Sequence, residues 1–140
     1  MAEGLLKSRL PEKLAGRVTV SSAGTHALHG NLAQPHAIEV MREHGVDISR
    51  HRARLLNRGM VADADLVLIM ETFHFAFVKK ASWFKKINIR RLTEFDPDGD
   101  SGDVPDPMGE AVAAYRDSAG IINHALKGVV THLEKLLENQ

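Results

Sequence analysis

Hydrophobic positions at the start of the chain change from a helical to a strand-like period. The first apolar stripe has the four-residue spacing of one helix face and consists of Leu6, Leu10 and Leu14. Pro11 and Gly16, two residue types that interrupt helices, lie within and after this stripe, and the β-branched run RVTVSS follows at residues 17–22. The pattern therefore predicts a helix and then a strand.

A second helical stripe lies in the segment AQPHAIEVMREHG at residues 33–45. Its apolar face carries Ala37, Ile38 and Met41. Pro35 stands near the start and Gly45 just past the end, which is the usual asymmetry of helix termini. We therefore expect a second helix in this segment.

The second half of the chain predicts two strands and two helices. DLVLIM at residues 65–70 is apolar without alternation, as expected for a strand covered on both faces, whereas INIRRL at residues 87–92 alternates like an edge strand. Between them, TFHFAFVKKASWF at residues 72–84 is helical in pattern. A long amphipathic helix is expected from Gly109 to about Leu137, and its stripe consists of Val112, Tyr115, Ala119, Ile122, Leu126, Val129, Leu133 and Leu136.

The alternation of strands and helices, without an internal repeat, predicts an α/β fold with helices on both faces of a small parallel sheet. A length of 140 residues suits a single domain covering residues 1–140. Three visible strands are few for this architecture. Because the pattern begins on a helix, we expect one strand of the sheet to be missing from the chain.

Charge and hydropathy limit the partners. Lys and Arg total 18, as do Asp and Glu, so no overall field attracts nucleic acid or an anionic membrane, and neither is expected as a partner. The longest apolar run is far shorter than the roughly 20 residues of a membrane helix. The first ten residues lack the charged-then-apolar order of a signal peptide, so a cytoplasmic location is predicted.

The composition also limits the chemistry. The chain has no cysteine, which excludes a disulfide, a thiolate metal site and a thiol nucleophile within these residues. Its eight histidines show no ligand spacing, and His26 and His29 lie in a glycine-containing loop without a carboxylate nearby in sequence. No metal and no cofactor are predicted.

Five segments, in chain order, resemble landmarks of the low-molecular-weight protein tyrosine phosphatase family: MAEGLLKSRL, VSSAGT, ISRHRAR, DLVLIM and DVPDPMG. The resemblance covers nearly the whole chain and implies a three-layer α/β/α fold. It also implies hydrolysis of phosphotyrosine on proteins through a phosphocysteine intermediate. Phosphorylated proteins are then the expected partners, and phosphate or another oxyanion is the expected ligand of the loop that forms this intermediate.

That loop is not found in the sequence. In the family, a strand and a C-x-x-x-x-x-R-S-P loop precede the helix that begins M-A-E, and the loop supplies the nucleophilic Cys and the phosphate-binding Arg. Here M-A-E opens the chain. A start codon assigned too late, a shortened expressed form and a real variant are the three explanations. We expect the 140-residue polypeptide itself to be inactive.

The resemblance places the missing strand inside the sheet, between residues 17–22 and 65–70. About three buried apolar side chains on such a strand contribute roughly 5–9 kcal/mol. Whole domains are stable by only about 5–15 kcal/mol. We hypothesise that the chain does not hold the family fold as an unmodified monomer. Instead it pairs the two orphaned strands, recruits a strand from another copy in a homo-oligomer, or remains loosely packed.

One candidate catalytic residue remains. By resemblance, Asp106 in DVPDPMG is the general acid that protonates the leaving group and later activates water. Asp followed by Pro107 is also an ordinary helix start, with Asp as the N-cap, and both interpretations stay open. Ser22 and His51 resemble the pair of residues that supports the phosphate loop of the family by hydrogen bonds. If the resemblance is set aside, they are interpreted as a serine at the end of a strand and a histidine on the surface.

The substrate class stays open as well. A short basic run consists of Arg50, Arg52, Arg54 and Arg58. We interpret it as a solvated face in preference to a docking site for acidic phosphoproteins. Met108 and Gly109 follow Asp-Pro where phosphotyrosine enzymes often carry paired aromatics, a pattern that also resembles bacterial protein-arginine phosphatases of the same fold. Arsenate reductases of this fold need further cysteines and are disfavoured. A non-catalytic domain and a chance α/β scaffold are the remaining alternatives.

Overall fold

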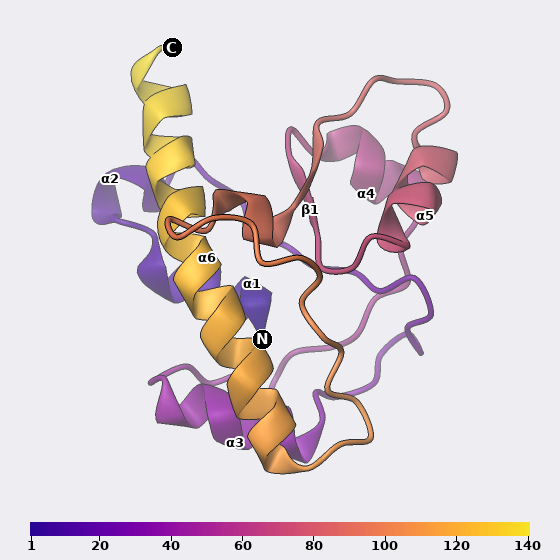
Figure 1. The fold of residues 1–140 in the computed structure, drawn as a ribbon. Helices are drawn as coiled ribbons and strands as arrows, with labels where there is room; N and C mark the ends of the chain where they lie inside the picture. The colour runs from indigo at the N-terminus through magenta and orange to yellow at the C-terminus, as the bar shows by residue number, and fades with distance from the viewer.

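The computed structural model describes all 140 residues (Figure 1). The elements in chain order are α1 (Ala2–Arg9), α2 (Glu12–Ala15), α3 (Pro35–Glu43), α4 (Arg58–Asp63), β1 (Val67–Ile69), α5 (His74–Ala81), β2 (Ile89–Arg91), the 3-10 helix η1 (Leu92–Phe95) and α6 (Val112–Glu138). The fold is α/β with a small parallel sheet, as the sequence predicts. The short helix α4 is an addition to the prediction, and no helix is long and apolar enough to cross a membrane.

The sheet consists of β1 and β2, which pair in parallel with Val67 opposite Ile89. Leu68 packs against the large core cluster, whereas Val67 and Ile69 belong to a smaller cluster with α4 and α5. Because successive side chains of a strand point to opposite faces, β1 is covered on both sides. This confirms the interpretation of the unalternating run at residues 65–70.

The prediction of a strand at residues 17–22 is wrong. The segment forms no strand, and the nearest strand-like contact is a single parallel bridge between Gly24 and Leu55. From Thr19 to Ala23 no backbone N–H donates to a backbone carbonyl. A β-branched run adopts ladder pairing only when a neighbouring strand offers partners, and none lies beside this segment.

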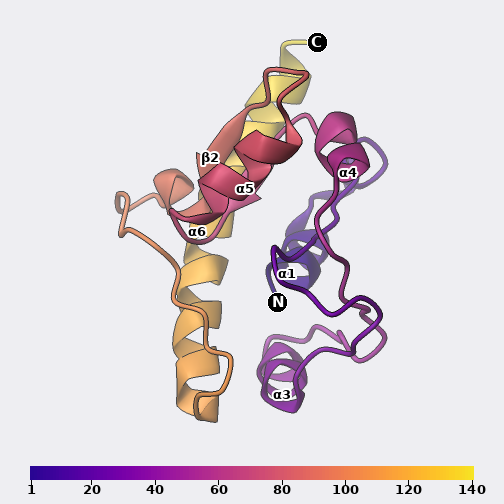
Figure 2. The same ribbon diagram turned by 90° about the vertical axis from the view of Figure 1, so that its right-hand side faces the viewer.

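The core is built along α6, which runs the length of the molecule in Figures 1 and 2. Buried residues of α1, α3 and α6, together with Val46, Ile48, Leu92 and Val104, form one cluster of 15 residues. The α6 residues buried in it are Tyr115, Ala119, Ile122, Ala125, Leu126 and Val129. The predicted stripe is therefore confirmed over most of its length, but Leu136 is 45% exposed because α6 extends past the core.

The 3-10 helix η1 lies unusually close to α6. A Cβ atom added at Gly128 would lie 1.6 Å from the carbonyl oxygen of Phe95. No side chain larger than hydrogen fits there, so Gly128 allows the backbone after β2 to contact α6 directly. This contact places the chain that leaves the sheet against the helix that follows the candidate acid.

Candidate active site

Asp106 lies on the connection between η1 and α6, and we call residues 103–110 the acid loop. Val104 is buried in the core, and its N–H donates to the Met70 carbonyl, just past β1, at 2.8 Å. The buried Ser118 hydroxyl of α6 donates to the Pro105 carbonyl at 2.7 Å. The two residues directly before Asp106 are therefore fixed to the end of β1 and to α6.

The carboxyl of Asp106 is exposed and only partly engaged. Its Oδ1 accepts a hydrogen bond from the Met108 N–H at 3.1 Å, and its Oδ2 makes none. The helix α6 begins at Val112 with Ala111 as its N-cap. The interpretation of Asp106 as the N-cap of the last helix is thus wrong, because a turn containing Gly109 at φ 82° separates the two. One carboxyl oxygen therefore has no hydrogen-bond partner within the protein.

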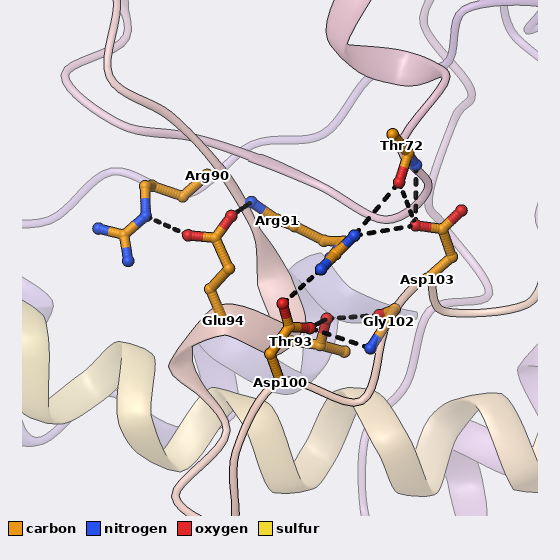
Figure 3. A network of polar contacts seen from close by, with 8 residues as sticks. All are labelled: Thr72, Arg90, Arg91, Thr93, Glu94, Asp100, Gly102 and Asp103. Atoms are coloured by element: carbon orange, nitrogen blue, oxygen red, sulfur yellow. Dashed lines mark hydrogen bonds and ion pairs between the residues drawn. The ribbon is translucent and has the colours of Figure 1, made fainter.

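A polar network fixes the beginning of the acid loop to β2 and to the segment that follows β1 (Figure 3). Asp103 Oδ1 accepts hydrogen bonds from the Thr72 N–H at 2.9 Å and the Thr72 hydroxyl at 2.7 Å. Arg91 lies 3.6 Å from the same oxygen and also pairs with Asp100. The Thr72 hydrogen bonds, followed by the charge of Arg91, hold the pKa of Asp103 below its ordinary value.

Ser22 and His51 meet at a third residue, Glu3 of α1. The Ser22 hydroxyl donates to the Glu3 carboxylate, and His51 Nδ1 lies 3.8 Å from it. Lys7 pairs with the other oxygen at 2.6 Å. Burial raises the pKa of Glu3, but the hydrogen bonds from Lys7 and Ser22 and the charges of Lys7 and His51 outweigh it, so the net pKa is lowered.

Sequence reasoning missed Glu3, Asp103 and Thr72. Glu3 stands out in the sequence only as the acid in the first turn of α1, and nothing there indicates its contacts with distant segments. Asp103 belongs to the same DVPDPMG segment as Asp106 but lacks a distinguishing spacing. Asp106 makes no hydrogen bond or ion pair with Ser22 or His51, so the structure joins Ser22 to His51 through Glu3 and joins neither of them to Asp106.

The basic run divides into different roles. Arg54 donates from Nε and Nη2 to the Ser22 carbonyl at 3.2 and 3.0 Å. The Arg58 guanidinium lies 5.6 Å from the ring of Trp83. Arg50 and Arg52 are exposed, as the interpretation of a solvated face predicts. Arg54, in contrast, helps to hold the segment that carries Ser22.

One group of side chains has metal-ligand character. Single ligand atoms of Asp96, Asp98 and His124 all lie within 4.8 Å of one another. His124 Nε2 is 2.7 Å from the Asp98 carboxylate and 3.3 Å from that of Asp96. A histidine N–H satisfies such carboxylates without an ion. His26 contacts the ring of Phe77 instead of a ligand set.

The family model for low molecular weight phosphotyrosine protein phosphatase matches residues 1–139. The chain belongs to this family. It is similar to several proteins of the family over most of their length.

The probable low molecular weight protein-tyrosine-phosphatase EpsP of Ralstonia nicotianae is 34% identical over 136 residues, covering 97% of this chain and 88% of the relative. The protein-arginine-phosphatase of Bacillus subtilis is 30% identical over 135 residues, covering 96% and 88%. The structure of the YwlE arginine phosphatase from Geobacillus stearothermophilus superimposes with a TM-score of 0.85 at 28% identity, covering 99% and 87%.

The residues of this chain lack the nucleophile that the family resemblance implies. The 140 residues contain no cysteine, so no thiolate in them can form a phosphocysteine. What these residues hold is a carboxyl on a fixed loop and a hydrogen-bonded group at the start of α1.

Proposed function

We propose that the protein is a low molecular weight protein-tyrosine phosphatase of the cytoplasm in which Asp106 is the general acid. The observation that carries the proposal is the carboxyl of Asp106, which has one unpaired oxygen on a loop anchored at Val104 and Pro105. A proton donor must be held in place while one oxygen stays free. The proposed reaction requires the C-x-x-x-x-x-R loop of the family in the same polypeptide.

The proposed reaction has two steps. The cysteine thiolate attacks phosphorus, the bond to the tyrosine oxygen breaks, and Asp106 gives its proton to that oxygen. The Asp106 carboxylate then takes a proton from water, the water oxygen bonds to phosphorus, and the sulfur–phosphorus bond breaks. The products are tyrosine, inorganic phosphate and the restored thiolate.

Ser22 and His51 are proposed as positioning residues. They contact Glu3 in the first turn of α1, the helix that the family resemblance places directly after the phosphate loop. The N-terminus of a helix favours a bound anion, so groups that fix α1 also fix the geometry for phosphate. Glu3 acts in this arrangement as the acceptor that joins Ser22 to His51.

Phosphoarginine is the second candidate substrate. Met108 follows Asp-Pro and is 67% exposed, so that position presents no aromatic wall for a phosphotyrosine ring. The relative named protein-arginine-phosphatase is 30% identical and matches 96% of the chain. Paired peptides carrying phosphotyrosine or phosphoarginine, assayed for phosphate release by the active enzyme, decide between the two.

The deciding experiment compares two polypeptides: the 140 residues alone, and a form in which the reading frame upstream of Met1 is translated. We expect phosphate release from an aryl phosphate at mildly acid pH only from the longer form. Asp106→Asn should depress that activity about 10²–10⁴-fold, most strongly for poor leaving groups. Asp117→Asn on α6, also an exposed aspartate, is the matched control.

Two results would defeat the proposal. An upstream frame without an apolar strand and a C-x-x-x-x-x-R loop would favour a non-catalytic domain. Turnover by the 140 residues that disappears in Asp106→Asn would show a nucleophile other than cysteine. Mass spectrometry of the N-terminal peptide of the protein isolated from cells gives an independent measure of where the natural chain begins.

A further inference from the structure

The segment from Phe73 to Phe84, which comprises helix α5, its N-cap and the turn after it, exposes most of the aromatic side chains of the protein. The exposed rings and their exposed fractions are Phe73 (50%), Phe75 (45%), Phe77 (40%), Trp83 (72%) and Phe84 (44%). Single exposed apolar residues are ordinary on a protein surface, but a group of them within one short segment indicates an interaction surface. The buried side of α5, at Val78, holds the helix on the domain and leaves these rings outside.

The same segment carries an excess of positive charge. Between Glu71 and Glu94 the sequence has no acidic residue, and its basic residues are Lys79, Lys80, Lys85, Lys86, Arg90 and Arg91. Lys79, Lys80 and Lys86 form no ion pair, and Lys85 donates to the Ala62 carbonyl. The whole chain has a net charge of zero, so this excess is local.

Aromatic and basic side chains surround one hollow, which we call the Trp83 hollow. Its volume is about 540 Å³, and it is lined by Lys79, Ser82, Trp83, Phe84, Lys85 and Lys86. The rings of Trp83 and Phe84 meet edge to face with centroids 6.0 Å apart. Apart from the buried Ser82 hydroxyl, its side chains carry no hydroxyl, amide or carboxylate group.

We propose that the Trp83 hollow docks the protein on an anionic lipid bilayer. Trp83 lies at the level of the headgroups, where its amphipathic ring is favoured, with the apolar ring of Phe84 beside it. Lys79 and Lys86 contact lipid phosphates. An apolar signal and a basic signal together give stable peripheral binding. The lining contains no acidic side chain, so its charge complements the phosphates of an anionic surface.

This inference is independent of the phosphatase activity. The sequence-based expectation of no membrane partner rests on the net charge, which averages the basic segment with acidic residues elsewhere in the chain. At a membrane, only charges within about a Debye length of the surface count, so the local excess decides the attraction.

Trp83 is the only tryptophan, so its fluorescence reports the environment of the hollow directly. We expect a blue shift when the 140-residue protein meets vesicles of phosphatidylcholine mixed with phosphatidylglycerol. Pure phosphatidylcholine should give none, and added salt should reverse the shift. Lys79→Gln with Lys86→Gln should weaken binding roughly fivefold for each charge removed. Lys127→Gln with Lys135→Gln, two exposed lysines of α6, is the matched control.

The contribution of the aromatic rings is tested with the double variant Trp83→Ala with Phe84→Ala. Because this variant lacks the tryptophan whose fluorescence reports binding, its binding is measured by sedimentation with the same vesicles. We expect this double variant to remain mostly in the supernatant, with a circular dichroism spectrum like that of the parent protein. No shift with anionic vesicles would overturn the proposal, as would equal weakening in the α6 control. An equal shift with polyglutamate or inorganic phosphate alone would also overturn it, by showing a site for soluble anions.

Discussion

Asp103 Oδ1 receives two hydrogen bonds from Thr72, one from its N–H at 2.9 Å and one from its hydroxyl at 2.7 Å. Thr72 follows β1, and Asp103 begins the acid loop, so this pair joins the end of the sheet to the segment that carries Asp106. Such contacts suit the proposed role of Asp106 as a proton donor, because small displacements of a catalytic group cost large factors in rate.

The first prediction concerns this contact. In a form that also carries the phosphate loop, Asp103→Ala should lower kcat for aryl phosphates about tenfold and leave KM nearly unchanged, because the loop that holds Asp106 loses one of its anchors. Thr72→Val should have a similar effect, and the double variant should be little worse than either single one. Additive losses in the double variant would show that the two residues act separately.

The second prediction concerns Glu3 and pH. Because the pKa of Glu3 is lowered in the folded chain, its carboxylate contributes stability above the unfolded value of about 4.5, and this is lost as the pH falls through the folded pKa. The free energy of unfolding of the parent protein should therefore fall between about pH 6 and about pH 3. In Glu3→Gln the fall should be smaller by about 1 kcal/mol, measured by urea unfolding.

Glu12→Gln is the control for that experiment, since Glu12 is exposed and makes no side-chain hydrogen bond or ion pair. Its pH dependence should follow that of the parent protein. A Glu3→Gln variant with an unchanged slope would show that the contacts with Ser22, His51 and Lys7 contribute nothing to stability.

The third prediction concerns the close contact between α6 and η1. Gly128→Ala should destabilise the protein by about 1–3 kcal/mol, because the new methyl group collides with the Phe95 carbonyl. Gly120→Ala lies in the same helix with no atom within 4 Å of the new Cβ, and it should stabilise by about 0.5–1 kcal/mol through helix propensity. Thermal unfolding of both variants gives the comparison, and stabilisation by both would contradict the contact.

The fourth prediction concerns the association state of the 140-residue chain. The N–H groups from Thr19 to Ala23 lack backbone partners, and the sheet has two strands. An open sheet this small is marginal by itself. We expect size-exclusion chromatography with light scattering to show oligomers, or urea unfolding to be broad. A monomer that unfolds in one steep cooperative transition would refute this expectation.

Several features of this protein follow from the sequence alone. The unalternating run at residues 65–70 and the stripe on α6 predict a covered strand and a core helix, because hydrophobic period depends on which faces are buried. The segment DVPDPMG singles out Asp106 through its resemblance to the family. The absence of cysteine is likewise a property of composition, and it limits the chemistry of the 140 residues whatever their fold.

The tertiary structure determines which segments of the chain become neighbours. Residues 17–22 have strand composition but form no strand, because ladder bonds come from a neighbour that the segment cannot supply itself. Asp106 looks like a helix cap in the sequence, yet the turn at Gly109 moves the start of α6 to Val112. The meeting of Ser22 and His51 at Glu3 joins residues distant in sequence, and only the packing of α1 brings them into contact.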